Sequence, residues 1–119
     1  MGLFDLTDTV LQRGLEGASL RQQVLSNNLA NANTAGFKRS DVDFESSLAS
    51  ALDSSDPTQS LNSLAFAPQT DSSTTMTLDG NNVDTDTEMA NLTSNAVEYE
   101  TLAAIAQQRF ATLKAAMGS

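Results

Sequence analysis

The chain has 119 residues, with 15 acidic and 6 basic residues, and its formal net charge at pH 7 is −9. This charge disfavours nucleic acid and anionic membrane surfaces as partners. The chain has no His and no Cys, which removes the commonest general base, thiol chemistry and disulfides.

The first residues, Met1 to Asp5, lack the basic segment and the long apolar run of a secretory signal peptide. No run of apolar residues approaches the length of a membrane span. If the protein leaves the cytoplasm, we therefore expect a route that needs no cleaved signal.

A helical pattern runs from about Asp5 to Asn33. Its stripe advances in alternating steps of four and three residues, the heptad spacing of a helix that packs along a partner. Gly14 and Gly17 each weaken a helix by about 1 kcal/mol relative to Ala, which indicates that this helix forms fully only against a partner. The stripe consists of Leu11, Leu15, Ala18, Gln22, Leu25, Leu29 and Ala32, in which Gln22 is the one polar residue.

An Asn-rich run ends this helix, because Asn and Gly tolerate the left-handed backbone that closes helices. Beyond it, Lys38 and Arg39 directly precede a group of carboxylates. One interpretation is a solvated loop with local charge pairing. The functional alternative is a docking corner with Phe37 and Phe44 as apolar anchors. This corner, from Asn31 to Phe44, includes Asn31, Asn33, Gly36, Phe37 and Phe44.

The middle of the chain, from Ser46 to Thr77, is polar. Fourteen of its 32 residues are Ser or Thr, and it contains both prolines. Such a segment buries too little apolar surface to fold by itself. We expect it to be flexible in the monomer and to hold a short extended or β-hairpin piece.

Asp79 to Asp84 forms a turn that leads into the C-terminal helix, since Asp-Gly and Asn-Asn are strong turn signals. A calcium loop is the alternative there, with oxygen donors at Asp79, Asn81, Asp84, Asp86 and Glu88. The spacing departs from the EF-hand pattern, because Val83 occupies the fifth position and Gly80 the second. We therefore expect no metal site.

One long helix is predicted from Thr85 to Met117. Thr85 and Glu88 fit a capping box at its start. A heptad stripe follows the whole helix, and it cannot stabilise an isolated helix in water, so the helix must pack on a partner surface. The stripe consists of Met89, Leu92, Ala96, Tyr99, Ala103, Ala106, Phe110, Leu113 and Met117.

These patterns predict an all-α fold in which two long terminal helices pair as an antiparallel coiled coil. The predicted division is an N-terminal helix region (1–36), a loop and variable middle (37–84) and a C-terminal helix region (85–119). No Gly-x-Ser-x-Gly, Walker A or Gly-x-Gly-x-x-Gly pattern occurs. We therefore expect no enzymatic activity and no cofactor.

Two motifs carry a family resemblance. The run from Ser26 to Phe44, with its core Asn-Leu-Ala-Asn-Ala-Asn-Thr-Ala-Gly-Phe-Lys, resembles the N-terminal signature of the flagellar rod, hook and hook-associated proteins. That signature typically reads Asn-Ile-Ala-Asn-Ala-Asn-Thr-Pro-Gly-Tyr-Lys, so Ala35 and Phe37 depart from it. The run from Asp79 to Ala90 resembles the motif that precedes the family's C-terminal helix. The short chain is similar to the proximal rod members.

The resemblance implies a structural subunit of the bacterial flagellar basal-body rod, which polymerises through its terminal helices into a hollow shaft that transmits torque and surrounds the export channel. Implied partners are further copies, rod proteins of the FlgC, FlgF and FliE type, the membrane ring and the flagellar type III export apparatus. The implied location is the periplasm-spanning rod of the basal body. The implied working surface is the two stripes together with the Asn31–Phe44 corner.

Three alternatives remain open at this point. One is a FlgC-like rod subunit, which carries a similar C-terminal motif. Another is a soluble coiled-coil adaptor or secretion chaperone, which forms a stable small oligomer in dilute solution. The third is a small calcium-binding module, which changes its helicity when Ca²⁺ is added.

Overall fold

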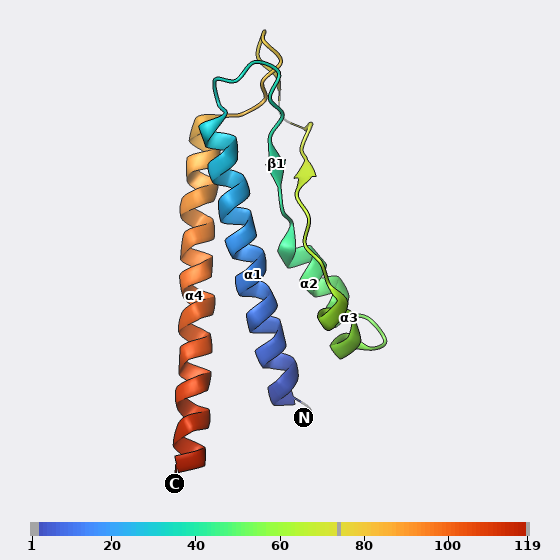
Figure 1. Ribbon diagram of the computed structural model, residues 1–119, viewed down its shortest axis with the longest axis vertical. Helices are drawn as coiled ribbons and strands as arrows, with labels where there is room; N and C mark the ends of the chain where they lie inside the picture. The colour runs from blue at the N-terminus through green and yellow to red at the C-terminus, as the bar shows by residue number, and fades with distance from the viewer. Residues whose placement is uncertain (1–2, 74, 119) are drawn as a thin grey trace.

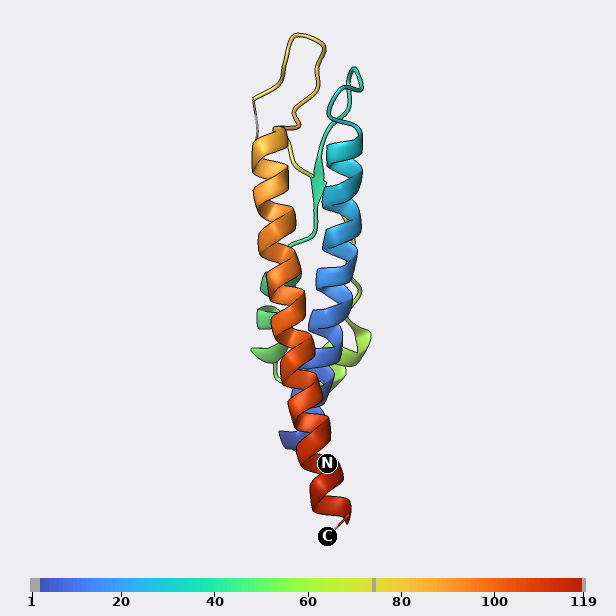
Figure 2. The same cartoon turned by 90° about the vertical axis from the view of Figure 1, so that its left-hand side faces the viewer.

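The computed structural model describes residues 3–73 and 75–118. Two long helices dominate it: α1 (Leu3–Ala30) and α4 (Thr85–Gly118). They lie antiparallel side by side, as Figures 1 and 2 show from two directions. The molecule is thin and elongated, measuring 64 × 30 × 14 Å along its principal axes. The predicted fold, mostly helical with paired terminal helices, is confirmed.

Side-chain contacts near both ends hold the antiparallel alignment of these helices. Near one end, Arg109 Nε of α4 donates a hydrogen bond to Asp8 Oδ1 of α1 at 2.9 Å. Near the other end, Asn28 Nδ2 of α1 donates to both carboxylate oxygens of Glu88 at 3.4 Å. Because α4 has 34 residues and α1 has 28, the C-terminal end of α4 extends beyond the start of α1 (Figure 1).

The start of α4 differs from the prediction. Asp84 caps the helix, since its Oδ1 accepts hydrogen bonds from the backbone N–H of Asp86 at 3.1 Å and of Thr87 at 3.3 Å. Thr85 is the first helical residue. The capping box of Thr85 and Glu88 was a wrong prediction, because the Glu88 side chain turns into the interior of the protein and does not reach back to the helix end.

The middle of the chain contains more regular structure than its composition indicated. Two short helices, α2 (Phe44–Leu52) and α3 (Pro57–Ser63), are each capped by an Asp side chain, of Asp43 and Asp56 respectively. The strands β1 (Ser40–Asp41) and β2 (Gln69–Thr70) pair antiparallel. They provide a short extended piece, but they form no hairpin, because α2 and α3 lie between them in the sequence. These elements form a third layer on the side of α1 away from α4 (Figure 1).

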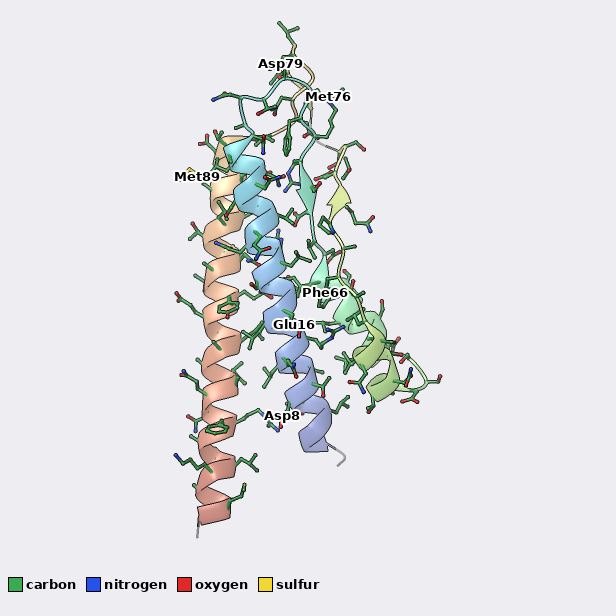
Figure 3. All side chains as sticks on the ribbon, viewed as in Figure 1. Asp8, Glu16, Phe66, Met76, Asp79 and Met89 are labelled. Atoms are coloured by element: carbon green, nitrogen blue, oxygen red, sulfur yellow. The ribbon has the colours of Figure 1, made fainter. Side chains whose placement is uncertain are left out.

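The core lies where this third layer meets α1. Phe44, with 2% of its surface exposed, packs with Ala18 and Val42. Its ring stands edge-on to Phe66, with 6.4 Å between the ring centroids. Burying a side chain of this size contributes roughly 2 kcal/mol. Figure 3 labels Phe66 between α1 and the short helices.

Gly17 makes this core possible. A Cβ atom added at Gly17 would lie 2.5 Å from the Cβ of Phe44, closer than real side chains approach. The glycine that weakens the isolated helix therefore provides the space in which α2 contacts α1.

Among the described residues, no helix is long and apolar enough to cross a membrane.

Candidate assembly surface

The end of α1 and the turn before α4 bind each other directly. The side-chain Nδ2 of Asn81 donates hydrogen bonds to the backbone oxygens of Asn31 at 2.9 Å and of Thr34 at 2.7 Å. These oxygens belong to the turn that closes α1. The backbone N–H of Gly36 donates to the oxygen of Asp79 at 2.8 Å. The two motifs identified in the sequence are therefore two halves of one contact.

A second pair of contacts extends this junction toward β1. The backbone N–H of Arg39 donates to Asn82 Oδ1 at 2.7 Å. In turn, Asn82 Nδ2 donates to the backbone oxygen of Asp71 at 2.6 Å. Both Asn81 and Asn82 are buried. The Asp79–Asp84 turn is therefore tied to three segments of the chain by side-chain amides.

Arg39 stands at the centre of a partly buried group of charges, in which Arg39 and Glu88 are buried. Its guanidinium donates to the carboxylates of Glu88, Asp71 and Asp41. Arg21 of α1 also donates to Asp41, at 2.8 and 3.3 Å. We call these five residues the Arg39 cluster: Arg21, Arg39, Asp41, Asp71 and Glu88. The cluster joins α1, β1, the segment after β2 and the first turn of α4.

The charges of the cluster shift the pKa values of its members. Burial alone would lower the pKa of Arg39, but the carboxylates of Glu88, Asp41 and Asp71 raise it above its ordinary value. For Asp41, burial acts to raise the pKa, whereas hydrogen bonds from Arg21, the Val42 N–H and Arg39 lower it below its ordinary value. The charged form of Asp41 therefore stabilises the folded chain.

The residues of the Asn31–Phe44 corner thus mainly contact other residues of the same chain. Arg39 pairs with Asp41, which agrees with the expectation of local charge pairing. Phe44 is buried in the core and has almost no exposed surface to offer a partner. Phe37 and Asn31 are half-buried, whereas Asn33 and Gly36 are exposed.

The stripe of α1 faces the interior of the chain. Leu11, Ala18 and Leu25 are buried, and Leu15, Leu29 and Ala32 are half-buried. Gln22, the polar member, accepts a hydrogen bond through its Oε1 from Asn95 Nδ2 of α4 at 2.8 Å. The residue that interrupts the apolar pattern is therefore part of the contact between the helices.

The stripe of α4 is only partly in contact with α1. Leu92, Ala96, Ala103 and Ala106 are half-buried. Five further members are exposed to solvent, and Figure 3 shows Met89 on the side of α4 that points away from α1. The exposed members are Met89, Tyr99, Phe110, Leu113 and Met117.

The side of α4 that lies against α1 is rotated by one residue from the predicted stripe. It contains Glu88, Asn95 and Leu102, and each directly precedes a stripe residue, about 100° away around the helix. Asn95 Nδ2 donates to the Ala18 oxygen at 2.8 Å. Hydropathy missed this face because its buried residues are polar. The buried polar residues that sequence reasoning left out of the site are Asn28, Arg39, Asn81, Asn82, Glu88 and Asn95.

A groove runs between α1 and α4 and has a volume of about 680 Å³. It spans residues 8–23 of α1 and residues 99–113 of α4, about four helical turns of each. Asp8 and Glu16 are among its polar lining residues. Its apolar lining consists of Leu11, Leu15, Leu20, Tyr99, Ala106, Phe110 and Leu113.

The C-terminal end of α4 continues this apolar surface. Phe110 has 68% of its surface exposed and Met117 has 78%. Residues 110–118 are all exposed. Apolar side chains repeated along one exposed helix end indicate a protein contact, because soluble monomers rarely expose large contiguous apolar patches.

The calcium alternative finds no support in this geometry. Asn81 binds the end of α1, and Glu88 binds Arg39, so these two oxygen donors of the expected loop serve other contacts. Within residues 3–73 and 75–118, no group of three or more acidic side chains is placed to hold a metal ion.

Comparison with known proteins identifies the family. Residues 9–38 match the family model described as flagella basal body rod protein. The chain is 32% identical to the flagellar basal body rod protein FlgB of Borrelia hermsii, in an alignment that covers 92% of this chain and 94% of the relative. It is 32% identical to FlgB of Bacillus subtilis (strain 168), over 96% of this chain and 95% of the relative. FlgB of Yersinia enterocolitica is 35% identical over 76% of this chain and 77% of the relative.

The chain belongs to the FlgB family of flagellar basal body rod proteins. Its function is structural: it is a subunit of the rod of the flagellar basal body. These relatives favour neither the FlgC-like alternative nor the adaptor alternative. The relatives are structural proteins and not enzymes.

Proposed function

We propose that this subunit joins the rod through the groove between α1 and α4 and through the exposed C-terminal end of α4. The observation that carries this proposal is the exposure of Tyr99, Phe110, Leu113 and Met117 along α4. Burying a large apolar side chain contributes roughly 2 kcal/mol. A partner that covers these four residues therefore gains several kcal/mol of binding free energy.

The remaining predicted interface residues divide into two groups under this proposal. Leu11 and Leu15 line the groove, and Met89 adds an exposed apolar side chain near the start of α4. The buried members, such as Leu25 and Phe44, act indirectly because they hold the two helices and the third layer in place. The terminal helices then serve as the assembling region and the segment 37–84 as their scaffold.

In the rod, such subunits surround a central channel and transmit torque along the shaft. We propose that the neighbours are further copies and other rod proteins of the FlgC, FlgF and FliE type. The chain reaches the periplasm through the flagellar type III export apparatus and meets the membrane ring at the base of the rod. The small number of buried apolar side chains in this thin molecule suits passage in an unfolded state.

A genetic experiment tests this function. The gene is deleted in the source bacterium, and swimming and basal bodies, seen by electron microscopy, are examined. We expect non-motile cells that hold membrane rings without a complete rod, and restoration of both by the wild-type gene. Normal flagella in the deletion strain would contradict the proposal.

Two variants on the same helix test the surface. Phe110→Asp places a charge on the exposed apolar end of α4 and should not restore motility, because burying an unpaired charge at an interface costs several kcal/mol. Gln107→Asp adds the same charge at another exposed position of the helix, outside the predicted stripe and the groove, and should restore it. Equal effects from the two variants would show that the proposed surface is wrong.

A further inference from the structure

Four residues of α4 contact α1 at intervals of seven residues. Since seven residues make nearly two turns of an α-helix, these four form a line along one side of α4. Three of them are polar or charged, so hydropathy does not reveal the line. We call these residues the α4 ladder: Glu88, Asn95, Leu102 and Arg109.

The two ends of the ladder bind side chains of α1. Asn28 Nδ2 donates hydrogen bonds to both carboxylate oxygens of Glu88 at 3.4 Å. Arg109 Nε donates to Asp8 Oδ1 at 2.9 Å. The ends of the ladder are 21 residues apart on α4, and their partners are 20 residues apart on α1. The ladder therefore follows α1 along one line for most of its length.

The two middle members also fit residues of α1. Leu102 lies against Gly14, where an added Cβ atom would be 3.3 Å from Leu102 Cδ1. Asn95 Nδ2 donates to the Ala18 oxygen and to Gln22 Oε1, each at 2.8 Å. Asn95 Oδ1 is buried and accepts no hydrogen bond from any residue that the structure describes. Because a buried, unpaired polar atom costs stability, an apolar side chain would pack better at this position.

A second line of residues on α4 is more apolar than the ladder. Its members directly follow the four ladder residues and belong to the apolar stripe predicted from the sequence. They are Met89, Ala96, Ala103 and Phe110. Each of the two lines forms a heptad seam with the same intermediate residues, Leu92, Tyr99, Ala106 and Leu113. Because these are shared, the two seams differ by a rotation of α4 of only about 50°, half of the 100° between successive residues.

Burial of apolar surface alone favours the second line over the ladder. In the structure, however, 57% of Met89 and 68% of Phe110 are exposed. Phe110 and Leu15 line the groove of about 680 Å³ from the two helices. A rotation that turns Phe110 toward α1 closes this groove from within the same chain. The same rotation breaks the contacts of Asn95 and Arg109, so these contacts oppose it.

We infer that the α4 ladder holds α4 in the rotation that leaves the second line exposed, and that a chain without the ladder turns α4 and buries this line against its own α1. The ladder residues are positioning residues of the assembly surface. They make the pairing of the two helices less stable, but they keep the surface open to a neighbour. A buried polar residue can fix the alignment of paired helices at such a cost in stability. This inference rests on the proposed function, because the second line includes part of the proposed surface.

The double variant Asn95→Leu/Arg109→Leu tests the ladder. It removes the two polar members that can be lost without leaving a buried charge unpaired. Glu88 is kept because it pairs with the buried Arg39. Asp8, with 50% of its side chain exposed, remains hydrated without Arg109. We expect the midpoint of urea unfolding to be at least as high as that of the parent chain, because an apolar side chain replaces the unpaired Oδ1.

Thiol labelling measures the rotation, since the chain contains no cysteine of its own. Phe110→Cys places a thiol on the second line. Thr101→Cys places one at an exposed position about 180° away around the helix, where labelling reports only unfolding. In the double variant we expect alkylation at position 110 to become slower than in the parent chain, while alkylation at position 101 stays unchanged.

A disulfide between positions 14 and 102 reports the contact that the ladder makes in this structure. Gly14→Cys and Leu102→Cys bring two thiols together there. Under mild oxidation the bond should form readily in the parent chain and more slowly in the double variant. The control Ser94→Leu/Gln108→Leu adds the same side chains at exposed positions directly before the two replaced residues. It should resemble the parent chain in both measurements.

Two results would overturn the inference. One is alkylation at position 110 that is as fast in the double variant as in the parent chain, since α4 has then not turned. The other is faster alkylation at both positions 110 and 101, because the ladder then only stabilises the fold and does not set the rotation of α4.

The inference and the proposed function fail differently. If both hold, the double variant does not restore motility to the deletion strain. Slower alkylation at position 110 in a double variant that still restores motility contradicts the proposed surface and leaves the rotation standing. Unchanged alkylation, with Phe110→Asp still unable to restore motility, contradicts the ladder inference alone.

Discussion

The carboxylate of Glu88, with 1% of its surface exposed, accepts hydrogen bonds from the guanidinium of Arg39, 49 residues earlier in the chain. This contact joins the first turn of α4 to the segment that follows α1. Arg39 belongs to the first motif of the family resemblance, Ser26–Phe44, and Glu88 belongs to the second, Asp79–Ala90. The motifs therefore hold the two terminal helices in their alignment, and the surface that remains for assembly is along the helices.

Removal of Glu88 should destabilise the fold strongly. Glu88→Ala leaves the buried Arg39 without its main partner on α4, and breaking a buried pair by removing one member costs about 3–5 kcal/mol. Urea unfolding followed by circular dichroism measures this loss in the free energy of unfolding. Asp86→Ala, at an exposed position in the same turn, should change it by less than about 0.5 kcal/mol. Equal losses from the two variants would contradict a structural role of the pair.

Loss of the Asn81 side chain should loosen the end of α1. Asn81→Ala removes three side-chain hydrogen bonds: the two that Nδ2 donates to the Asn31 and Thr34 oxygens and the one that Oδ1 accepts from the backbone N–H of Val83. At about 1 kcal/mol for each bond, we expect a loss of roughly 3 kcal/mol. Hydrogen exchange of the last turn of α1 should also become faster. Asn33→Ala, at an exposed position in the same loop, is the control and should have little effect on either measurement.

The two glycines of α1 should respond to alanine in opposite directions. At Gly17 a Cβ atom would meet the side chain of Phe44 at 2.5 Å, so Gly17→Ala should cost about 1–3 kcal/mol through overpacking. At Gly14 the nearest atom is Leu102 Cδ1, at 3.3 Å, the terminal methyl group of a side chain that can shift slightly. There the helix propensity of Ala, worth about 1 kcal/mol, should leave Gly14→Ala neutral or more stable. Melting temperatures distinguish the two outcomes, and equal destabilisation would contradict the packing described for Phe44.

Stability should fall on acidification. The pKa values of Asp41 and Asp71 are lowered in the folded chain. For Asp41, burial acts to raise the pKa, but hydrogen bonds from Arg21, the Val42 N–H and Arg39 lower it. For Asp71, hydrogen bonds from Ser73 and the charge of Arg39 lower the pKa. A carboxyl whose pKa is lower in the folded state stabilises the fold above its unfolded pKa, and this contribution is lost as the pH falls through the folded value. Glu98, whose pKa burial and Glu45 raise, acts in the opposite direction.

The measurement is a series of urea titrations between about pH 7 and about pH 2. We expect the free energy of unfolding to decrease steadily below the ordinary carboxyl range. In Asp41→Asn the overall stability should be lower and the decrease on acidification should be smaller, since one of the titrating groups is gone. An unchanged acid dependence in this variant would show that Asp41 does not contribute.

The sequence predicted the two long helices because their stripes repeat with the same heptad spacing over many turns. It did not predict which side of α4 meets α1. That side is set by the polar residues Glu88 and Asn95, whose buried partners lie far away in sequence. A pattern of apolar residues alone places the contact near Met89, which is exposed in the structure.

In the middle of the chain, composition alone did not predict the regular structure that is present. The Ser and Thr content of this segment indicated flexibility, since few apolar residues are present to bury. The structure buries Leu61 of this segment, together with Val42 and Phe44 just before it. The packing of Phe44 requires Gly17 on a neighbouring helix, a tertiary feature that composition does not contain. The Asp43 and Asp56 caps were local signals for α2 and α3, and Asp56 followed by Pro57 is a typical helix start.

The most direct test of the account is a cryo-electron microscopy map of the rod in basal bodies isolated from the source bacterium, at a resolution that separates helices. The account predicts density for a helix of a neighbouring subunit along the groove between α1 and α4, in contact with Leu15 and Tyr99. A map in which this groove is open, with Phe110 and Met117 facing solvent in every subunit, would contradict it.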